Sequence, residues 1–348
     1  MMDRFGAAAE GIAGDRRRLA LAAVGVALLA IVPFTTTAYI TEIVFTGLVF
    51  AMLGISWNVL AGYAGQVSLG HAAFFGTGAF VSAWLTTPSR AGLPELIPLG
   101  SPAAVAIVSL LGGALAAGLL ALATGPIMFR LTGHYFAIGT LALAAIIQLV
   151  LLDQRRFSGG STGYYINGSI GADAMYLLAL VVTVGMLVAA YLVIESRWGL
   201  AMRAIHGDEG AASSLGVNPL RYKMYAFVIS SLMAGLTGAI YAQFTLYVNP
   251  ESTLDVVWMI DTLVVVILGG MGTMLGPVIG AGLFLALDTG LRAVAGGLAT
   301  TIEGLLIILF IVFVPSGLYG LVERRYLSDD EETETPPSDV EESRSEGA

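Results

Sequence analysis

The sequence has no cysteine, a single lysine and three histidines among its 348 residues. Without cysteine the chain has neither a disulfide framework nor a thiolate that binds a metal or acts as a nucleophile. The histidines, His71, His134 and His206, lie too far apart to show the close spacing of a zinc-binding helix, so we expect no metal site. The lysine, Lys223, does not follow a glycine-rich turn, so the chain has no predicted phosphate-binding loop and no cofactor site.

Charged residues are also scarce. They make up 12% of the chain, against 57% hydrophobic residues, and the mean hydropathy is +0.84. A bilayer core is about 30 Å thick and an α-helix rises about 1.5 Å per residue, so an apolar run of roughly 20 residues spans it. The composition predicts an all-α polytopic membrane protein with about ten transmembrane helices, bounded by lipid and without a nucleic-acid partner.

Apolar runs and their polar or Gly/Pro interruptions give the boundaries of these helices. The predicted spans lie at 19–37, 39–60, 68–87, 103–128, 134–152, 174–194, 222–248, 254–271, 275–295 and 300–321. Some of them contain enough glycine to predict broken or re-entrant helices. Two connections are long, 153–173 and 195–221, and we expect function to enter through them.

The two ends of the chain lie outside the predicted permease domain, 19–321. The basic block Arg16–Arg18 with the apolar run after it has the order of a secretory signal. Because a second apolar run begins almost at once at Tyr39, we interpret the first run as a membrane anchor and residues 1–18 as a cytoplasmic segment. Ten of the 25 acidic residues follow Val322, so residues 322–348 are predicted to be a disordered cytoplasmic tail.

The basic residues predict the orientation of the spans. With the N-terminus inside the cell, twelve basic residues lie in inner segments and four in outer ones, which agrees with the positive-inside rule. We therefore expect a multi-pass protein of the cell membrane with both termini in the cytoplasm. The inner set is Arg4, Arg16, Arg17, Arg18, Arg130, Arg197, Arg203, Arg221, Lys223, Arg324, Arg325 and Arg344, and the outer set is Arg90, Arg155, Arg156 and Arg292.

The inner connection 195–221 is far more polar than its surroundings. Leu200, Ala204 and Ile205 have helical spacing, and the acidic pair Asp208-Glu209 begins a second short helix, where the macrodipole favours negative charge. Gly216 and Pro219 are expected to end it. The loop is either a plain connector or a cytoplasmic docking element. As a docking element it would present four residues to an ATPase: Ala211, Ala212, Leu215 and Gly216.

Four polar residues at membrane depth are candidates for the translocation path: Gln66, Ser68, His71 and Asp261. The first three stand in a glycine-rich segment, where a broken helix would aim backbone amides at a small anionic group. The alternative is close helix packing through small residues, with His71 as a hydrogen-bonded packing residue. An unpaired carboxylate at Asp261 would be costly in lipid, so it faces protein or water in either interpretation.

Several sequence motifs resemble those of one transporter family. The chain reads GYAGQVSLGHAAFFGTGAF at 62–80, LTGHYFAIGTLAL at 131–143, SGGSTGY at 158–164 and ILGGMGTMLGPVIGA at 267–281. The inner connection adds SRWGLAMRAI at 196–205 and RYKMYAF at 221–227. In this order the motifs resemble the LivM-type permeases of branched-chain amino-acid ABC importers, and the likeness covers roughly residues 41 to 321.

The resemblance implies a function and a set of partners. It implies a non-enzymatic permease subunit that forms a path for branched-chain amino acids or similar small solutes, such as urea or amides. The implied partners are two cytoplasmic ATPases, a second LivH-like permease chain and an external solute-binding protein. The alternative is an ion-coupled secondary transporter or channel, which would require coupling acids or histidines in mid-span, and Asp261 is the clearest deeply placed carboxylate.

Overall fold

The computed structural model describes residues 20, 22–91, 101–167, 170–313 and 317–318. The predicted N-terminal segment 1–18 and acidic tail 322–348 lie outside these residues. The elements, in chain order, are a helix Ala22–Thr35, α2 (Ala38–Asn58), η1 (Val59–Tyr63), α3 (His71–Thr86), η2 (Pro88–Ala91), α4 (Pro102–Met128), α5 (His134–Asp153), α6 (Arg155–Ser158), η3 (Gly160–Thr162), β1 (Tyr164–Tyr165), α7 (Ala172–Ile194), α8 (Arg197–Gly207), α9 (Glu209–Ser214), α10 (Pro219–Thr245), β2 (Tyr247–Val248), α11 (Pro250–Thr253), α12 (Val256–Gly269), α13 (Gly276–Ala295), η4 (Gly296–Leu298) and α14 (Ala299–Phe313).

The helices confirm the predicted all-α polytopic fold. Within the described part of the chain, seven helical stretches are long and apolar enough to cross a membrane: Ala38–Tyr63, Pro102–Met128, His134–Asp153, Ala172–Ile194, Pro219–Thr245, Pro250–Gly269 and Gly276–Leu298. The predicted spans 19–37, 68–87 and 300–321 coincide with shorter helices, Ala22–Thr35, α3 and α14. Proline at the first turn of α4 and α10 fits their starts, because the first backbone N–H groups of a helix lack partners.

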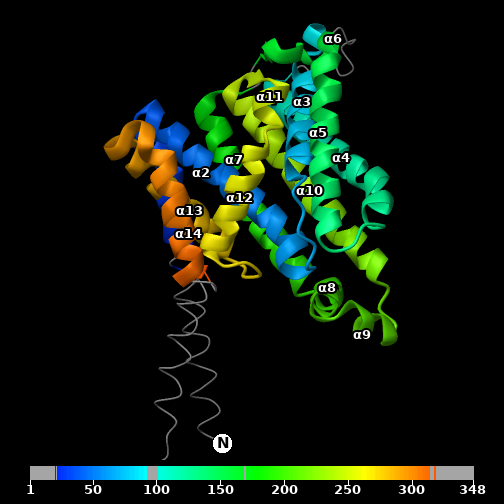
Figure 1. Ribbon diagram of the computed structural model, residues 1–348. Helices are drawn as coiled ribbons and strands as arrows, with labels where there is room; N and C mark the ends of the chain where they lie inside the picture. Colours follow the sequence, from blue (N-terminus) through cyan, green and yellow to red (C-terminus); the bar gives the residue numbers. More distant parts are fainter. Residues whose placement is uncertain (1–19, 21, 92–100, 168–169, 314–316, 319–348) are drawn as a thin grey trace, which may run out of the picture.

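The long helices form two groups that meet at α2 and α10. Helices α3, α4 and α10 pack against each other, while α12, α13 and α14 pack against one another and, through α12 and α13, against α2 (Figure 1). Helix α10 also contacts α2, so it joins the groups. The largest buried side chains at this centre include Trp57, Phe74 and Phe227.

Glycine allows the closest helix contacts. A Cβ atom at Gly78 would overlap the carbonyl oxygen of Gly235, and one at Gly238 would overlap that of Phe75, so α3 and α10 touch backbone to backbone. The same kind of overlap occurs at Gly280 with Val265 in the α12–α13 hairpin. Close packing through small residues, one of the two interpretations of the glycines, is therefore confirmed at these positions.

Three breaks interrupt the helical pattern. Helix α2 runs into the π-helical turn η1 before the chain reverses to α3. The predicted span 254–271 corresponds to α12, which begins at Val256 and is separated from the single turn of α11 by Leu254 and Asp255. The third interruption is a two-stranded antiparallel sheet, in which Tyr164 and Tyr165 of β1 pair with Val248 and Tyr247 of β2.

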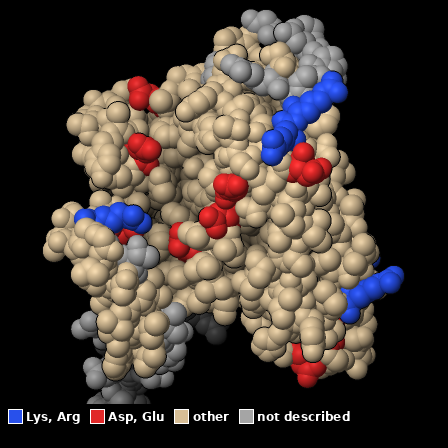
Figure 2. Space-filling model, turned by 45° about the horizontal axis from the view of Figure 1, so that its top comes forward, with Lys and Arg blue, Asp and Glu red and all other residues tan. Residues whose placement is uncertain are grey.

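The two ends of the bundle differ. Helices α8 and α9 lie at one end, and α6 and α11 lie at the other (Figure 1). We call these the inner and the outer end, following the predicted orientation. Figure 2 looks toward the outer end and shows a hollow with acidic side chains around it, set in a surface that is otherwise mostly uncharged.

Candidate coupling and transport site

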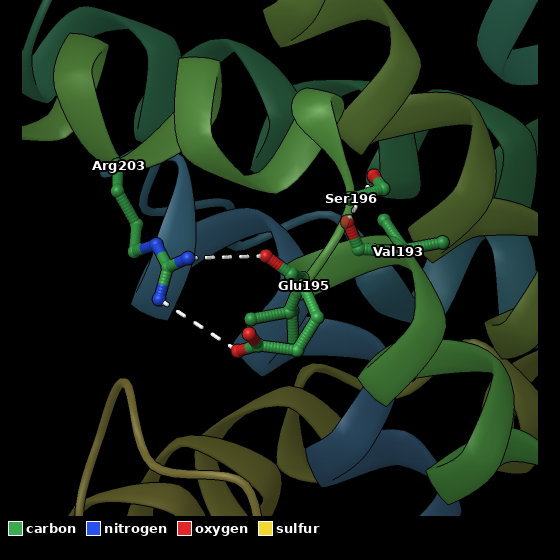
Figure 3. Close-up of polar contacts among 5 residues, drawn as sticks. Val193, Glu195, Ser196 and Arg203 are labelled. Carbon is green, nitrogen blue, oxygen red and sulfur yellow. Dashed lines mark hydrogen bonds and ion pairs between the residues drawn. The ribbon is translucent and has the colours of Figure 1, made fainter.

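The inner helix pair α8–α9 begins with a side-chain cap. The Ser196 hydroxyl accepts a hydrogen bond from the Trp198 N–H at 3.1 Å. It donates one to the Val193 carbonyl at 2.6 Å (Figure 3). Arg203 reaches back across the junction to the Ile194 carbonyl and, at 3.9 Å, to the Glu195 carboxylate. The turn between α7 and α8 is therefore fixed from both sides, which sets the direction in which α8 leaves the membrane-spanning bundle.

Helix α9 has signals at both of its ends, as predicted. The Asp208 carboxylate accepts from the Ala211 N–H at 2.9 Å, a typical N-cap. At the other end, Gly216 has a φ of 88°, and the N–H groups of Gly216 and Val217 donate to Ser213 and Ala212. This is a Schellman motif, which ends helices with glycine in the left-handed conformation.

The junction with α10 differs from the prediction in one respect. Pro219 does not end α9 but stands in the first turn of α10, whose N-cap Asn218 accepts from the Arg221 N–H at 3.1 Å. A proline is tolerated there because that N–H has no helical partner. An ion pair of 2.6 Å between Lys223 and Glu209 then holds α9 against α10.

The four predicted docking residues do not share one environment. Leu215 is 86% exposed, and Ala211 and Gly216 are exposed beside it. Ala212 is only 3% exposed, so its methyl group packs inside this chain and is not presented to a partner. The exposed surface at the end of α9 therefore consists of a large leucine with small neighbours.

Two of the predicted path residues, Gln66 and Ser68, lie in the segment between η1 and α3, and His71 is the first residue of α3. Ser68 is fully buried: its carbonyl accepts from the Trp57 indole at 2.8 Å, and its hydroxyl accepts from the Gly70 N–H at 3.2 Å. Gln66 is half-buried and donates to the Ala64 carbonyl. This segment is thus an ordered hydrogen-bonded turn at the inner ends of α2 and α3.

His71 joins three helices. Its Nε2 atom lies 2.6 Å from the Ser230 hydroxyl of α10, which itself donates to the Ser56 carbonyl of α2 at 2.8 Å. Because that hydroxyl has only one hydrogen, His71 must donate from Nε2. The Ser56 hydroxyl in turn donates a hydrogen bond to the Ser230 carbonyl at 2.7 Å. His71 is thus hydrogen-bonded between helices, as the packing interpretation expects, while its Nδ1 atom is buried without a partner among the described residues.

Asp261 lies apart from these residues. It stands in the second turn of α12, is half-buried and interacts with the rest of the chain. The structure thus brings Ser68 and His71 together at the inner ends of α2 and α3, and it places Asp261 on a helix of the other group.

Sequence reasoning missed Asn58, the last residue of α2. Its side chain is 3% exposed and bridges to the α12–α13 connection, donating to the Thr273 carbonyl and accepting from the Gly272 N–H, both at 2.8 Å. A Cβ atom at Gly62 would overlap the Asn58 side-chain oxygen, so the π turn brings the backbone directly against this amide. The sequence did contain a signal for this role, because Asn58 is the one amide side chain in the predicted apolar span 39–60.

The helix pair contacts the turn between η1 and α3 through His206, at the end of α8. Gly65 has a φ of 68°, and a Cβ atom there would lie 2.8 Å from the His206 ring and 3.3 Å from its Cα. The end of α8 therefore presses on the turn that follows η1. Through Asn58 the same turn is connected to the loop 270–275, so a continuous line of contacts runs from α8 to the α12–α13 hairpin.

Comparison with known proteins identifies the family of this chain. A family model described as branched-chain amino acid transport system / permease component matches residues 39–315. The chain belongs to this family. It is a membrane permease subunit of the ABC importer class, which confirms the resemblance seen in its motifs.

Individual relatives agree with this family. The chain is 27% identical over 317 residues to the high-affinity branched-chain amino acid transport system permease protein LivM of Escherichia coli (strain K12), covering 82% of this chain and 71% of the relative. It is 26% identical over 293 residues to LivH of the same strain, covering 80% and 93%. It is 26% identical over 234 residues to the ribose import permease protein RbsC, also of that strain, covering 60% and 70%. No solved structure matches the chain.

Proposed function

We propose that this permease carries branched-chain amino acids, or similar small solutes, into the cell. It would pair with a second, LivH-like permease chain, receive the solute from an external binding protein and use two cytoplasmic ATPase subunits. The family and the LivM and LivH relatives support this set of partners. The proposal places the helix pair in the cytoplasm, because α8 contains Arg197 and Arg203 and the start of α10 contains Lys223. Both termini are proposed to lie on the same side.

The observation that carries the coupling role is the exposure of Leu215. The Leu215 side chain is apolar and 86% exposed, at the end of a helix that is capped and ion-paired. Burial of this side chain in an apolar cleft of a partner would remove apolar surface from water, which favours binding. Its exposed neighbours Ala211 and Gly216 are small, so a partner surface can approach closely. We assign ATPase contact to these three residues, with Ala212 supporting them from inside.

The test is Leu215→Glu in the assembled importer. A carboxylate in an apolar cleft would be desolvated, and we expect the affinity for the ATPase to fall by about 2 kcal/mol, or roughly thirtyfold, with loss of ATP-driven uptake. Co-purification of the ATPase and uptake into proteoliposomes measure both effects. Leu215 is a cleaner site than Gly216, where the φ of 88° would add backbone strain to any substitution.

The matched control is Leu298→Glu. Leu298 is 65% exposed and stands between α13 and α14, at the end of the bundle opposite to α9. The same chemical change there should leave ATPase binding intact. If Leu215→Glu retains the ATPase and uptake at the level of Leu298→Glu, the helix pair is only a connector. Competition of labelled leucine uptake by isoleucine, valine, urea and short amides then identifies the solute.

A further inference from the structure

A cavity lies between α3, α4 and α5, away from the residues discussed so far. Its volume is about 240 Å³, and one side of it is formed by α5, where Val150 is 54% exposed. The lining residues come from the outer halves of α3 and α5 and from the middle of α4: Thr77, Phe80, Val81, Trp84, Leu120, Ile147, Val150 and Leu151.

The cavity offers almost no polar contact to an occupant. Of its lining side chains, only Thr77 and Trp84 carry a hydrogen-bond donor, and both are already used. The Thr77 hydroxyl donates to the Ala73 carbonyl at 2.7 Å, and the Trp84 indole donates to the Phe157 carbonyl at 2.8 Å. A zwitterionic or amide solute would lose its water here without compensation, so the cavity is not suited to the transported solute.

The size and position of the cavity fit hydrocarbon. A dry apolar cavity of about 150 Å³ is large enough to bind benzene, and this one is larger. Its walls belong to membrane-spanning helices, where the surrounding solvent is lipid acyl chain. A stretch of one acyl chain can therefore enter beside Val150 and fill the space that the side chains leave.

Two arginines stand at the outer rim of the cavity. Arg155 and Arg156 form the first turn of α6, which follows α5 directly and lies at the outer end of the bundle (Figure 1). Both are exposed, and neither forms an ion pair among the residues that the structure describes. The bond from Trp84 to Phe157 ties the cavity wall to this turn, and the Arg156 guanidinium lies 5.9 Å from the Phe157 ring centroid.

We propose that this site binds an anionic phospholipid of the outer leaflet. One acyl chain occupies the cavity, and the phosphate group lies against Arg155 and Arg156, which supply the donors and the positive charge that a phosphate requires. The site goes beyond solute transport, because it lies on the lipid-facing wall of α3, α4 and α5. It provides a means by which the anionic lipid content of the membrane can influence the permease.

Lipids with brominated acyl chains test the proposal through Trp84. The assembled importer is placed in phosphatidylcholine nanodiscs that contain a minor fraction of brominated phosphatidylglycerol or of brominated phosphatidylcholine. The chain has four tryptophans, so the contribution of Trp84 is obtained by subtracting the Trp84→Phe variant. We expect stronger quenching of Trp84 by phosphatidylglycerol, and retention of this lipid through delipidation in native mass spectrometry.

Two variants separate the two halves of the site. Arg155→Gln with Arg156→Gln should lower the preference for phosphatidylglycerol by about fivefold for each arginine, while chain insertion remains. Val81→Phe should fill the cavity and remove the quenching by both lipids. The matched controls are Arg292→Gln, an arginine paired with Asp288 on α13, and Val181→Phe on the exposed face of α7. Neither control should change the quenching of Trp84.

Three outcomes would overturn the proposal. Equal quenching by both lipids in the wild-type protein would mean that the arginines do not select an anionic headgroup. Unchanged quenching in Val81→Phe would mean that no acyl chain enters the cavity. Failure of any brominated lipid to reach Trp84 in the assembled importer would mean that protein, such as the second permease chain, covers this wall.

Discussion

The inner helix pair and the buried centre are stabilised in different ways. The ends of helices α8 and α9 are set by local contacts: Ser196 and Asp208 cap their own helices, and Gly216 ends α9. At the centre, α2, α3 and α10 depend on contacts between residues far apart in sequence, such as His71 with Ser230. The difference teaches that a change at one end of α8 or α9 affects that helix end, whereas a change at the centre affects several helices at once.

The largest effect should come from the α3–α10 contact. In Gly238→Ala the added methyl group would overlap the Phe75 carbonyl oxygen, and neither backbone can withdraw without separating the helices. We expect a loss of about 4 kcal/mol or more in stability, enough to prevent isolation of folded protein. Fluorescence-detected size-exclusion chromatography of the expressed protein measures the folded yield.

The matched control for that change is Gly185→Ala in α7. A Cβ atom at Gly185 meets nothing within 4 Å, so alanine should be neutral or stabilise the helix by up to about 1 kcal/mol. A folded Gly238→Ala protein with a melting temperature equal to that of Gly185→Ala would show that the centre adjusts as freely as the lipid-facing surface.

The second prediction compares the same change in the two regions. Asn58→Asp puts a buried carboxylate against the Thr273 carbonyl and removes the donor that bonds to it, so we expect a loss of about 3 kcal/mol. Asn218→Asp keeps the acceptor for the Arg221 N–H, and aspartate is an equally good N-cap. Thermal unfolding in detergent should therefore separate the two variants widely.

Uptake assays sharpen this second comparison. Asn58 stands between the turn that α8 contacts and the loop 270–275, so its loss should also weaken the link between ATP hydrolysis and uptake. We expect Asn58→Asp to hydrolyse ATP in the assembled importer with fewer solutes carried per ATP. Equal solute-to-ATP ratios in the Asn58→Asp and Asn218→Asp proteins would exclude a coupling role for Asn58.

The smallest effect distinguishes two adjacent serines of α10. Ser230→Ala leaves His71 Nε2 without its acceptor and the Ser56 carbonyl without its donor, at a cost of about 1–3 kcal/mol. The Ser231 hydroxyl is equally buried and has no hydrogen-bond partner within the part of the chain that the structure describes, so Ser231→Ala should cost nothing or be stabilising. Melting temperatures in one detergent provide the comparison, and equal values for both variants would refute the importance of the His71 contact.

The difference between local and long-range contacts explains which features the sequence could predict. Asp208, Gly216 and the acidic start of α9 act within a few residues, so their roles followed from sequence spacing. The glycines of α3 and α10 were predicted to pack closely, but their partners were not, because a small residue does not identify the helix that it faces. His71 and Ser230 are 159 positions apart, and no local pattern connects them.

For the candidate site, too, the local features were predicted and the long-range contacts were not. The short helix before Leu215 was correctly predicted, but the burial of Ala212 depends on how that helix lies against the rest of the chain. Asn58 was missed because its two bonds reach residues more than 200 positions away. Asp261 was chosen as a candidate path residue because it is a carboxylate deep in a predicted span, and depth does not specify which helix group a residue joins.

The π turn η1 makes the length of this part of the chain critical. A π turn accommodates one residue more than an α turn, and each residue of a helix advances by about 100° and 1.5 Å. A one-residue deletion within 59–63 would therefore rotate Gly62 away from Asn58 and Gly65 away from His206. Loops commonly vary in length among relatives, but an insertion or deletion here would displace the two contacts through which this turn meets α8 and the loop 270–275.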